Sequence, residues 1–429
     1  MPQLSQPLAV PAYPRDEPLA ASQTDARLEQ HLEQAGRLYR QRWAYRGAWW
    51  VEARKLRLTE AHLCTHLLAL TNARCTGEDA WTTPSELFIG AVVRLLADTP
   101  DKTDQVLDGL LSARSRAEVM EALCLCGEQA AQLPLVDWYW AHAPLRASLF
   151  QLWASLDIQA PEACLIAALS DAQSPADQLA ALDYLATRGA AAVTHCRSFY
   201  DDRGRFAEVH PQVASAACRA GLLCGDTRAV DAAVGSLELV GDAQRESFLR
   251  VLALSDHRHA LSALRQYGER HPLESARLLA LHGSRQALLC LPDMVSRCDP
   301  DDVESVGFLA MGKALPRRSR SNTGLFRRPA DTGQSAGTVD ADAFAATLKT
   351  QLAKASASRW LAGEPLSLAM LGWLAPRVVG QGGQLLVERL ALQARKVCRI
   401  TARDWMTRRE RRLQTLTGKS VAGMVRSSA

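Results

Sequence analysis

Apolar residues recur along this chain in groups that are about thirty residues apart. The first residues of seven successive groups are Val119, Leu149, Leu179, Val213, Phe248, Leu278 and Val306. The steps between them are 30, 30, 34, 35, 30 and 28 residues. A near-constant period of this size is typical of stacked two-helix repeats and argues against a single closed core. An irregular all-α bundle with helices of similar length is the alternative interpretation.

Each group has the periodicity of an amphipathic helix. Leu149, Leu152 and Trp153, for example, occupy positions i, i+3 and i+4, which places them on one helix face. Eight positions after several of the first residues comes a residue that can end or cap a helix: Gly127, Asp157, Gly221 and Asp256. The sequence then predicts a second helix in each repeat, with candidates at residues 161–171, 231–240 and 260–269.

Changes in periodicity divide the chain into six parts. They are a flexible leader at 1–26, an N-terminal helical cap at 27–103, a repeat array at 104–315, a basic loop at 316–340, a C-terminal helical block at 341–418 and a tail at 419–429. We expect a helix over 81–99 that is capped at Ser85, and another that begins at Pro365, since proline suits a first helical turn. The expected fold is an all-α solenoid of stacked helix pairs, with the cap at one end and the block at the other.

Two tryptophans are candidate partner-binding residues. Trp49 and Trp50 crowd the junction between the two helices expected in the N-terminal cap. They either pack in the core or the cap, or form an exposed aromatic anchor for a partner, because tryptophan is enriched in binding hot spots.

The basic loop supplies the other candidates. Its arginines, which lie among Ser, Gly, Thr and Pro, are Arg317, Arg318, Arg320, Arg327 and Arg328. A loop of this length inside a helical stack is uncommon and often functional. It is either a solvated insertion or an electrostatic contact for an acidic partner or a nucleic acid. The later run Arg408–Arg412 is interpreted as the polar face of a last helix.

Composition favours no particular class of ligand. The 429 residues carry 50 basic and 46 acidic side chains, and the net charge of +4 gives no general attraction to nucleic acid or to an anionic membrane. The 11 cysteines are scattered without a CxxC pair, which indicates buried free thiols in a reducing compartment. We find neither a secretory signal nor a stretch of about 18 apolar residues that could span a bilayer. A cytoplasmic protein without a membrane partner is therefore expected.

No motif for catalysis, cofactor binding or metal binding stands out. Cys64 with His66, and His195 with Cys196, lack the second pair of ligands that a metal site needs. The glycines within 380–383 lack the preceding strand and the lysine of a phosphate-binding loop. We therefore expect no catalytic residue, no cofactor and no metal, although groups from distant repeats could still converge in space.

Several short segments point to one bacterial family by their order. In the N-terminal part they are His31–Ala35, Leu38, Tyr39, Arg42, Leu56, Glu60–Leu63, Leu87–Phe88 and Ala91. Further along they are Gly225–Val230, Arg359–Leu366, Trp405 and Arg408–Arg409. In this order the chain resembles a family of bacterial HEAT-repeat-like proteins that are often encoded near type VI secretion genes. The resemblance implies a HEAT-like α-solenoid, no catalytic residues to carry over, and an accessory role beside a secretion apparatus.

These observations favour a non-enzymatic protein-binding scaffold, which would be an accessory, adaptor or immunity-type factor of a type VI secretion system. The expected partner is another protein, either a secretion component or an effector, because the curved surface of a repeat array suits an extended partner. A nucleic-acid-binding α-solenoid is one alternative, based on the basic loop and the late arginine run. A HEAT-like lyase or glycosylase is another, based on fold analogy alone.

Overall fold

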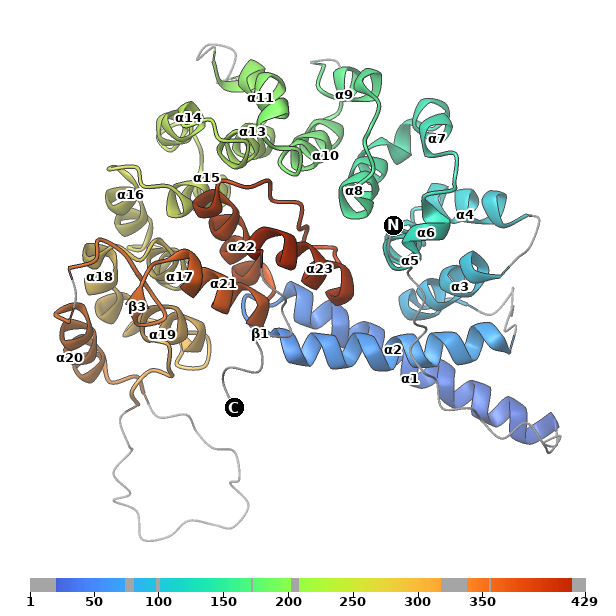
Figure 1. The fold of residues 1–429 in the computed structure, drawn as a ribbon, viewed down its shortest axis with the longest axis horizontal. Helices are drawn as coiled ribbons and strands as arrows, with labels where there is room; N and C mark the ends of the chain where they lie inside the picture. The colour runs from blue at the N-terminus through green and yellow to red at the C-terminus, as the bar shows by residue number, and fades with distance from the viewer. Residues whose placement is uncertain are drawn as a thin grey trace, which may run out of the picture.

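The computed structural model describes residues 21–73, 81–97, 101–170, 173–201, 208–317, 338–354 and 356–418. Within these residues almost all regular structure is helical, which confirms the all-α prediction (Figure 1). The strands are two-residue segments in two antiparallel pairs: β1 (Val51–Glu52) with β4 (Val378–Val379), and β2 (Trp360–Leu361) with β3 (Glu364–Pro365).

Three helices form the N-terminal part: α1 (Ala21–Gly47), α2 (Ala53–Asn72) and α3 (Pro84–Leu96). α1 begins at Ala21, within the segment predicted as a leader, where alanine and glutamine are good helix formers. The cap of α3 is Thr83 and not Ser85. Its Oγ1 accepts from Glu86 N at 3.3 Å, and Glu86 Oε2 accepts from Thr83 N at 2.9 Å. This capping box, with Pro84 in the first turn, places the cap two residues before Ser85, and the helix begins within the expected range of 81–99.

A row of helices follows, and each carries one of the seven apolar residues that open the expected repeats. The row consists of α5 (Arg116–Leu125), α8 (Arg146–Leu156), α10 (Pro175–Leu185), α13 (Pro211–Leu223), α15 (Asp242–Leu254), α17 (Pro272–His282) and α19 (Glu304–Met311). Each helix packs against the next one in the row. Six of the seven apolar residues are buried and Leu179 is half-buried. One period of the sequence therefore corresponds to one step along the row.

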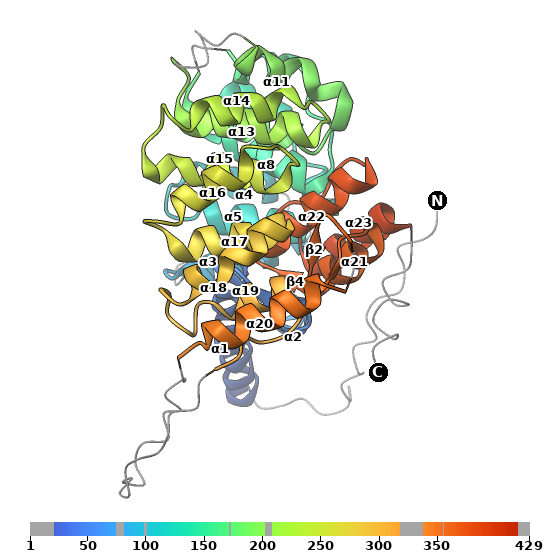
Figure 2. The same cartoon turned by 90° about the vertical axis from the view of Figure 1, so that its left-hand side faces the viewer.

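The other helices of this region lie outside the row and form a second layer (Figure 1). They are α4 (Lys102–Leu111), α6 (Gly127–Ala130), α7 (Leu135–Ala141), η1 (Ala143–Leu145), α9 (Glu162–Ala168), η2 (Gly189–Ala192), α11 (Val193–Tyr200), α14 (Arg228–Ser236), α16 (Ala260–Tyr267), α18 (Arg285–Val295) and α20 (Ala341–Leu352). Figure 2 shows the later ones stacked above one another. Together the two layers curve into an arc, with the row on its inner side.

The C-terminal helices turn back into this arc. They are α21 (Leu368–Leu374), η3 (Ala375–Arg377), α22 (Gln381–Ala394) and α23 (Met406–Thr417). α22 packs against α13 and α15 of the row, α23 packs against α2, and β4 pairs with β1 (Figure 1). A single cluster of buried apolar residues extends from α1 to α23. The sequence predicted a curved surface for an extended partner without choosing a face, and the inner side of the arc is partly occupied by the chain itself.

Two further expected helix boundaries are wrong. Gly221 does not end its helix but lies inside α13, where a Cβ would come within 2.3 Å of the Tyr200 hydroxyl. The chain turns instead at Gly225, whose φ of 94° favours glycine. Pro365 belongs to β3, and α21 begins at Leu368, after Ser367 accepts a capping hydrogen bond from Met370 N.

Candidate functional site

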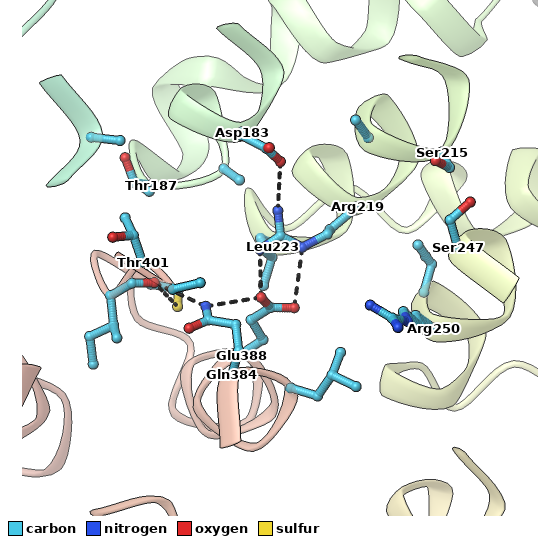
Figure 3. A pocket seen from close by; sticks show the side chains of 18 of the residues that line it. Asp183, Thr187, Ser215, Arg219, Leu223, Ser247, Arg250, Gln384, Glu388 and Thr401 are labelled. Carbon is cyan, nitrogen blue, oxygen red and sulfur yellow. Dashed lines mark hydrogen bonds and ion pairs between the residues drawn. The ribbon is translucent and has the colours of Figure 1, made fainter. Parts of the chain in front are cut away.

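A cavity of about 610 Å³ lies between the inner face of the row and α22 (Figure 3). α8, α10, α13 and α15 line one side, and α22 with the segment 398–403 lines the other. The apolar part of the lining includes Leu179, Leu223, Val251, Leu254, Leu385 and Ile400. The polar part comprises Gln151, Asp183, Thr187, Gln212, Ser215, Arg219, Ser247, Arg250, Gln381, Gln384, Glu388, Thr401 and Arg403. This mixture on an inner surface makes the cavity the leading candidate site.

Small residues on the row keep this space open. Ala154, Ala186, Ser215, Ala216 and Ser247 occupy lining positions on successive helices of the row. Their short side chains allow α22 to approach without filling the gap between the helices. Because successive helices of the row pack side by side, the same face of each helix contributes residues to the cavity wall.

An ion-pair cluster crosses the cavity from the row to α22 (Figure 3). Arg219 Nη2 lies 2.5 Å from Glu388 Oε1, and Arg219 Nη1 lies 3.0 Å from Asp183 Oδ1. The Glu388 side chain is only 1% exposed. Burial alone would lower the pKa of Arg219, but the carboxylates of Glu388 and Asp183 more than reverse this effect and the pKa is raised. Arg219 is therefore a permanent cation that holds α22 against α13.

The neighbouring polar groups extend this cluster. Gln384 Nε2 donates to Glu388 Oε1 at 3.1 Å and to the carbonyl of Ile400 at 3.0 Å. Gln384 Oε1 is buried and has no partner among the described residues, so the site retains an unused acceptor. Arg250 donates to Glu246 Oε1 at 2.8 Å and to Gln381 Oε1 at 3.0 Å.

The polar groups of the cavity form ion pairs and hydrogen bonds with one another. Arg219 forms ion pairs with both Asp183 and Glu388, so one guanidinium is shared by two carboxylates. Burial raises the pKa of Cys398 to about 12, so this thiol is protonated and a poor nucleophile at neutral pH. A converging set of titratable groups is what the enzyme alternative requires, but these groups bind α22 in place. The arrangement can bind polar and apolar groups of a ligand.

A second polar cluster fastens the C-terminal segment to the N-terminal helices. Arg42 is fully buried, with Nε 2.8 Å from Glu60 Oε1 and Nη1 2.8 Å from Glu121 Oε2. Its guanidinium carbon lies 3.9 Å from the ring centroid of Trp405. Burial raises the pKa of Glu121, but Arg46 and Arg42 lower it more, so the net shift is downward. Sequence analysis named Arg42 and Glu60 only as part of the family resemblance and predicted no buried ion pair, because nothing local distinguishes these charges from a solvated helix face.

The structure places both predicted tryptophans in contacts within the chain. The Arg277 guanidinium lies 5.2 Å from the ring centroid of Trp49, and the Trp50 ring lies 5.5 Å from that of Phe308. Both tryptophans are half-buried against the core. They join the α1–α2 junction to α17 and α19, which is the packing alternative considered for them, and they do not line the cavity.

Most of the predicted basic loop falls outside the described residues, including Arg318, Arg320, Arg327 and Arg328. Arg317 is described: it pairs with Val339 through a β-bridge, and Nη2 lies 3.5 Å from Asp301 Oδ1. Arg317 belongs to neither of the two polar clusters described above.

The arginine run at 408–412 is not simply a polar face. Arg409 is 5% exposed and donates to the carbonyls of Val378 and Gly383. Arg412 pairs with Asp404 at 2.8 Å. The available signal was spacing, because residue 409 follows Met406 by three positions and so lies on the apolar face of α23. Structural roles for these arginines weaken the nucleic-acid alternative.

The remaining candidate features do not assemble into a site. Among the described residues, no group of three or more His, Cys, Asp or Glu side chains is placed to hold a metal ion. None of the helices described is long and apolar enough to cross a membrane. Comparison of the chain with protein-family models, with curated proteins and with solved structures finds no match.

Proposed function

We propose that this protein is a non-enzymatic protein-binding scaffold, built as a HEAT-like α-solenoid whose inner face receives a segment of a partner. The observation that carries the proposal is the Arg219–Glu388 pair, because it holds a helix against the inner face of the row. A face that binds α22 through a buried ion pair and apolar side chains has the chemistry needed to bind a second protein segment.

The cavity beside α22 is the proposed entry point for that segment. Its apolar walls suit an aliphatic or aromatic side chain, and the free Gln384 Oε1 can accept a hydrogen bond from the partner. Ser215 and Ser247 offer further hydrogen-bonding groups on the opposite wall. The paired charges give selectivity, since a partner that separates them without replacing their contacts loses free energy.

The resemblance to bacterial HEAT-repeat-like proteins supports a more specific role. In that role the protein is a cytoplasmic accessory, adaptor or immunity-type factor of a type VI secretion system, and the partner is a secretion component or an effector. This assignment rests on the order of the short segments in the sequence, from His31–Ala35 to Arg408–Arg409.

Affinity capture from the native host, followed by mass spectrometry, tests the proposal. Ser247→Trp fills the cavity from the row, whereas Ser262→Trp adds the same bulk at an exposed position of α16 and is the matched control. Circular dichroism establishes that both variants fold. We expect wild type and Ser262→Trp to capture the same protein partner in similar amounts, and Ser247→Trp to capture at least about ten-fold less of it. Capture of no partner under several conditions, or equal capture by both variants, contradicts the proposal.

A further inference from the structure

A second cavity, of about 780 Å³, lies between the N-terminal helices and α23. Its apolar walls include Leu67, Leu68, Val92, Leu96, Leu125, Leu156 and Met406, and we call it the α2–α23 groove. Leu68 and Leu96 are 38% and 36% exposed, so large apolar side chains face solvent at its mouth. Sites for small molecules have volumes of roughly 300–1,000 Å³ and are mostly apolar with a few polar groups. The groove has both properties.

The charged groups that line the groove are three arginines and two glutamates. Arg408 and Arg411 line it, and neither forms an ion pair with a carboxylate in the part of the chain that the structure describes. Arg408 donates to the carbonyl of Ser155 at 3.3 Å and to its Oγ at 3.4 Å. Its guanidinium rests against the chain at Gly127, where a Cβ would lie 2.6 Å from Nη2. Two guanidinium groups beside an apolar surface are suited to a carboxylate ligand.

An unused donor lies in the same lining. Trp405 is 4% exposed, and its Nε1–H finds no hydrogen-bond partner within the described residues. A buried N–H without a partner costs free energy, which a ligand oxygen can recover. This donor is independent of the arginines and also favours an acceptor on the ligand.

The acidic groups of the lining do not cancel this preference. Glu60 is buried, and its two oxygens already accept from Arg42 Nε at 2.8 Å and from Met406 N at 2.6 Å. Arg57 at the rim is paired with Glu410. Glu128 is exposed at the edge of the groove, where water screens its charge.

We propose that the α2–α23 groove binds a monocarboxylate with an aliphatic chain of medium length, that is, a fatty acid. The chain lies along the leucines of α2 and α3, and the carboxylate lies at Arg408 and Arg411. The proposal does not depend on the protein-binding role, because the groove is separate from the cavity beside α22.

Dodecanoate below its micellar concentration is the probe, and displacement of a fluorescent dansyl fatty acid from the full chain is the measurement. We expect saturable binding of one molecule per chain. Dodecyltrimethylammonium, which has the same chain and the opposite charge, should compete at least about ten-fold less well. Equal competition by the two amphiphiles, or binding without saturation, overturns the proposal. Saturable binding of an acidic amphipathic peptide in place of dodecanoate also overturns it, in favour of a protein ligand.

A matched pair of variants on α2 tests the location. Leu68→Glu places a negative charge at the mouth of the groove, whereas Leu58→Glu places it at another exposed position of the same helix, outside the lining. We expect Leu68→Glu to weaken binding about ten-fold or more, and Leu58→Glu to change it less than about two-fold. Arg411→Gln, at an exposed position, should weaken dodecanoate without affecting the cationic amphiphile. Equal effects of the two leucine variants contradict the location.

Alkylation of Cys64 provides a readout that needs no substitution. Cys64 is half-buried and lines the groove, whereas Cys290 is half-buried on α18 and lies outside it. We expect dodecanoate to slow the alkylation of Cys64, measured by peptide mass spectrometry, and to leave that of Cys290 unchanged. Saturable binding with no protection of Cys64 places the ligand elsewhere and overturns the proposal.

Discussion

The ring of Trp50 lies 5.5 Å from the ring of Phe308, measured between centroids, and this contact joins the N-terminal hairpin to the last helix of the row. Beside it, the Arg277 guanidinium of α17 lies 5.2 Å from the ring of Trp49. The two ends of the arc are therefore in direct contact, and α22 and α23 lie in the space between them (Figure 1).

This end-to-end contact should contribute measurably to stability. Truncation of a fully buried aromatic side chain costs about 3–5 kcal/mol, and Trp50 is half-buried, so we expect Trp50→Ala to lower the free energy of unfolding by about 2 kcal/mol. In a double-mutant cycle with Phe308→Ala the coupling should be about 1 kcal/mol. Urea denaturation measures both values. Leu239→Ala, at a side chain that is 71% exposed, is the control, and a coupling near zero would contradict the contact.

Removal of one charge from the second polar cluster should be more costly. Glu121→Gln leaves Arg42 fully buried with a single carboxylate, Glu60, and we expect a loss of about 3 kcal/mol or more. The exposed pair of Arg297 with Asp293 supplies the control, since Asp293→Asn should cost less than about 1 kcal/mol. Chemical denaturation of both variants provides the comparison. Similar losses in the free energy of unfolding would show that the buried cluster contributes no more to stability than an exposed ion pair.

The Arg219–Glu388 pair should control the local stability of α22. Glu388→Gln keeps a hydrogen-bond acceptor for Arg219 but removes the charge, which should cost about 1–2 kcal/mol. Amide hydrogen exchange in α22 should then accelerate about ten-fold relative to α17. Asp293→Asn removes an exposed charge from the pair with Arg297 at the end of α18 and should leave α22 unchanged. Uniform acceleration across both helices would instead indicate a global effect.

Stability should fall in acid partly because of His282. Its pKa is lowered to about 3, first by burial and then by the charges of Arg359 and Arg389. In the unfolded chain the histidine has its ordinary pKa of about 6.5. Between pH 6.5 and 3 the unfolded chain therefore binds a proton at this residue and the folded chain does not. This difference lowers the free energy of unfolding by up to about 1.4 kcal/mol per pH unit.

His282→Gln tests this dependence. The variant should be less stable than wild type at pH 7, because it alters the contacts with Arg359, and the difference should shrink as the pH falls from 6.5. Thermal unfolding across this range measures the effect. His62→Gln, at an exposed position, should follow the wild-type curve, and a constant difference between His282→Gln and wild type would refute the assignment.

The local part of this fold is readable from the sequence. Phe248, Val251 and Leu252 lie within one helical turn, so their spacing alone predicts the buried face of α15. The same is true of the other helices in the row. The start of α3 is harder to predict, because both Thr83 and Ser85 are residue types that cap helices. Only the positions of Pro84 and Glu86 relative to Thr83 identify Thr83 as the cap.

The candidate site is not readable in this way. Arg219 and Glu388 meet only because the row curves, and the amount of curvature depends on small angles between successive helices that no local pattern records. For the same reason the sequence left both packing and partner binding open for Trp49 and Trp50. Arg409 shows the opposite case, since its spacing from Met406 placed it on a buried face and its charge argued for solvent.

Contact between Trp50 and Phe308 changes how far a local disturbance travels. In a linear array with two free ends, each module communicates with its immediate neighbours, and unravelling can start at either terminus without consequence for the other. Here a perturbation of the first hairpin reaches α19 directly, because the two ends pack against each other and neither end lacks a neighbour. Melting of the molecule should accordingly be concerted, and deletion of modules from one end would expose apolar surface at both.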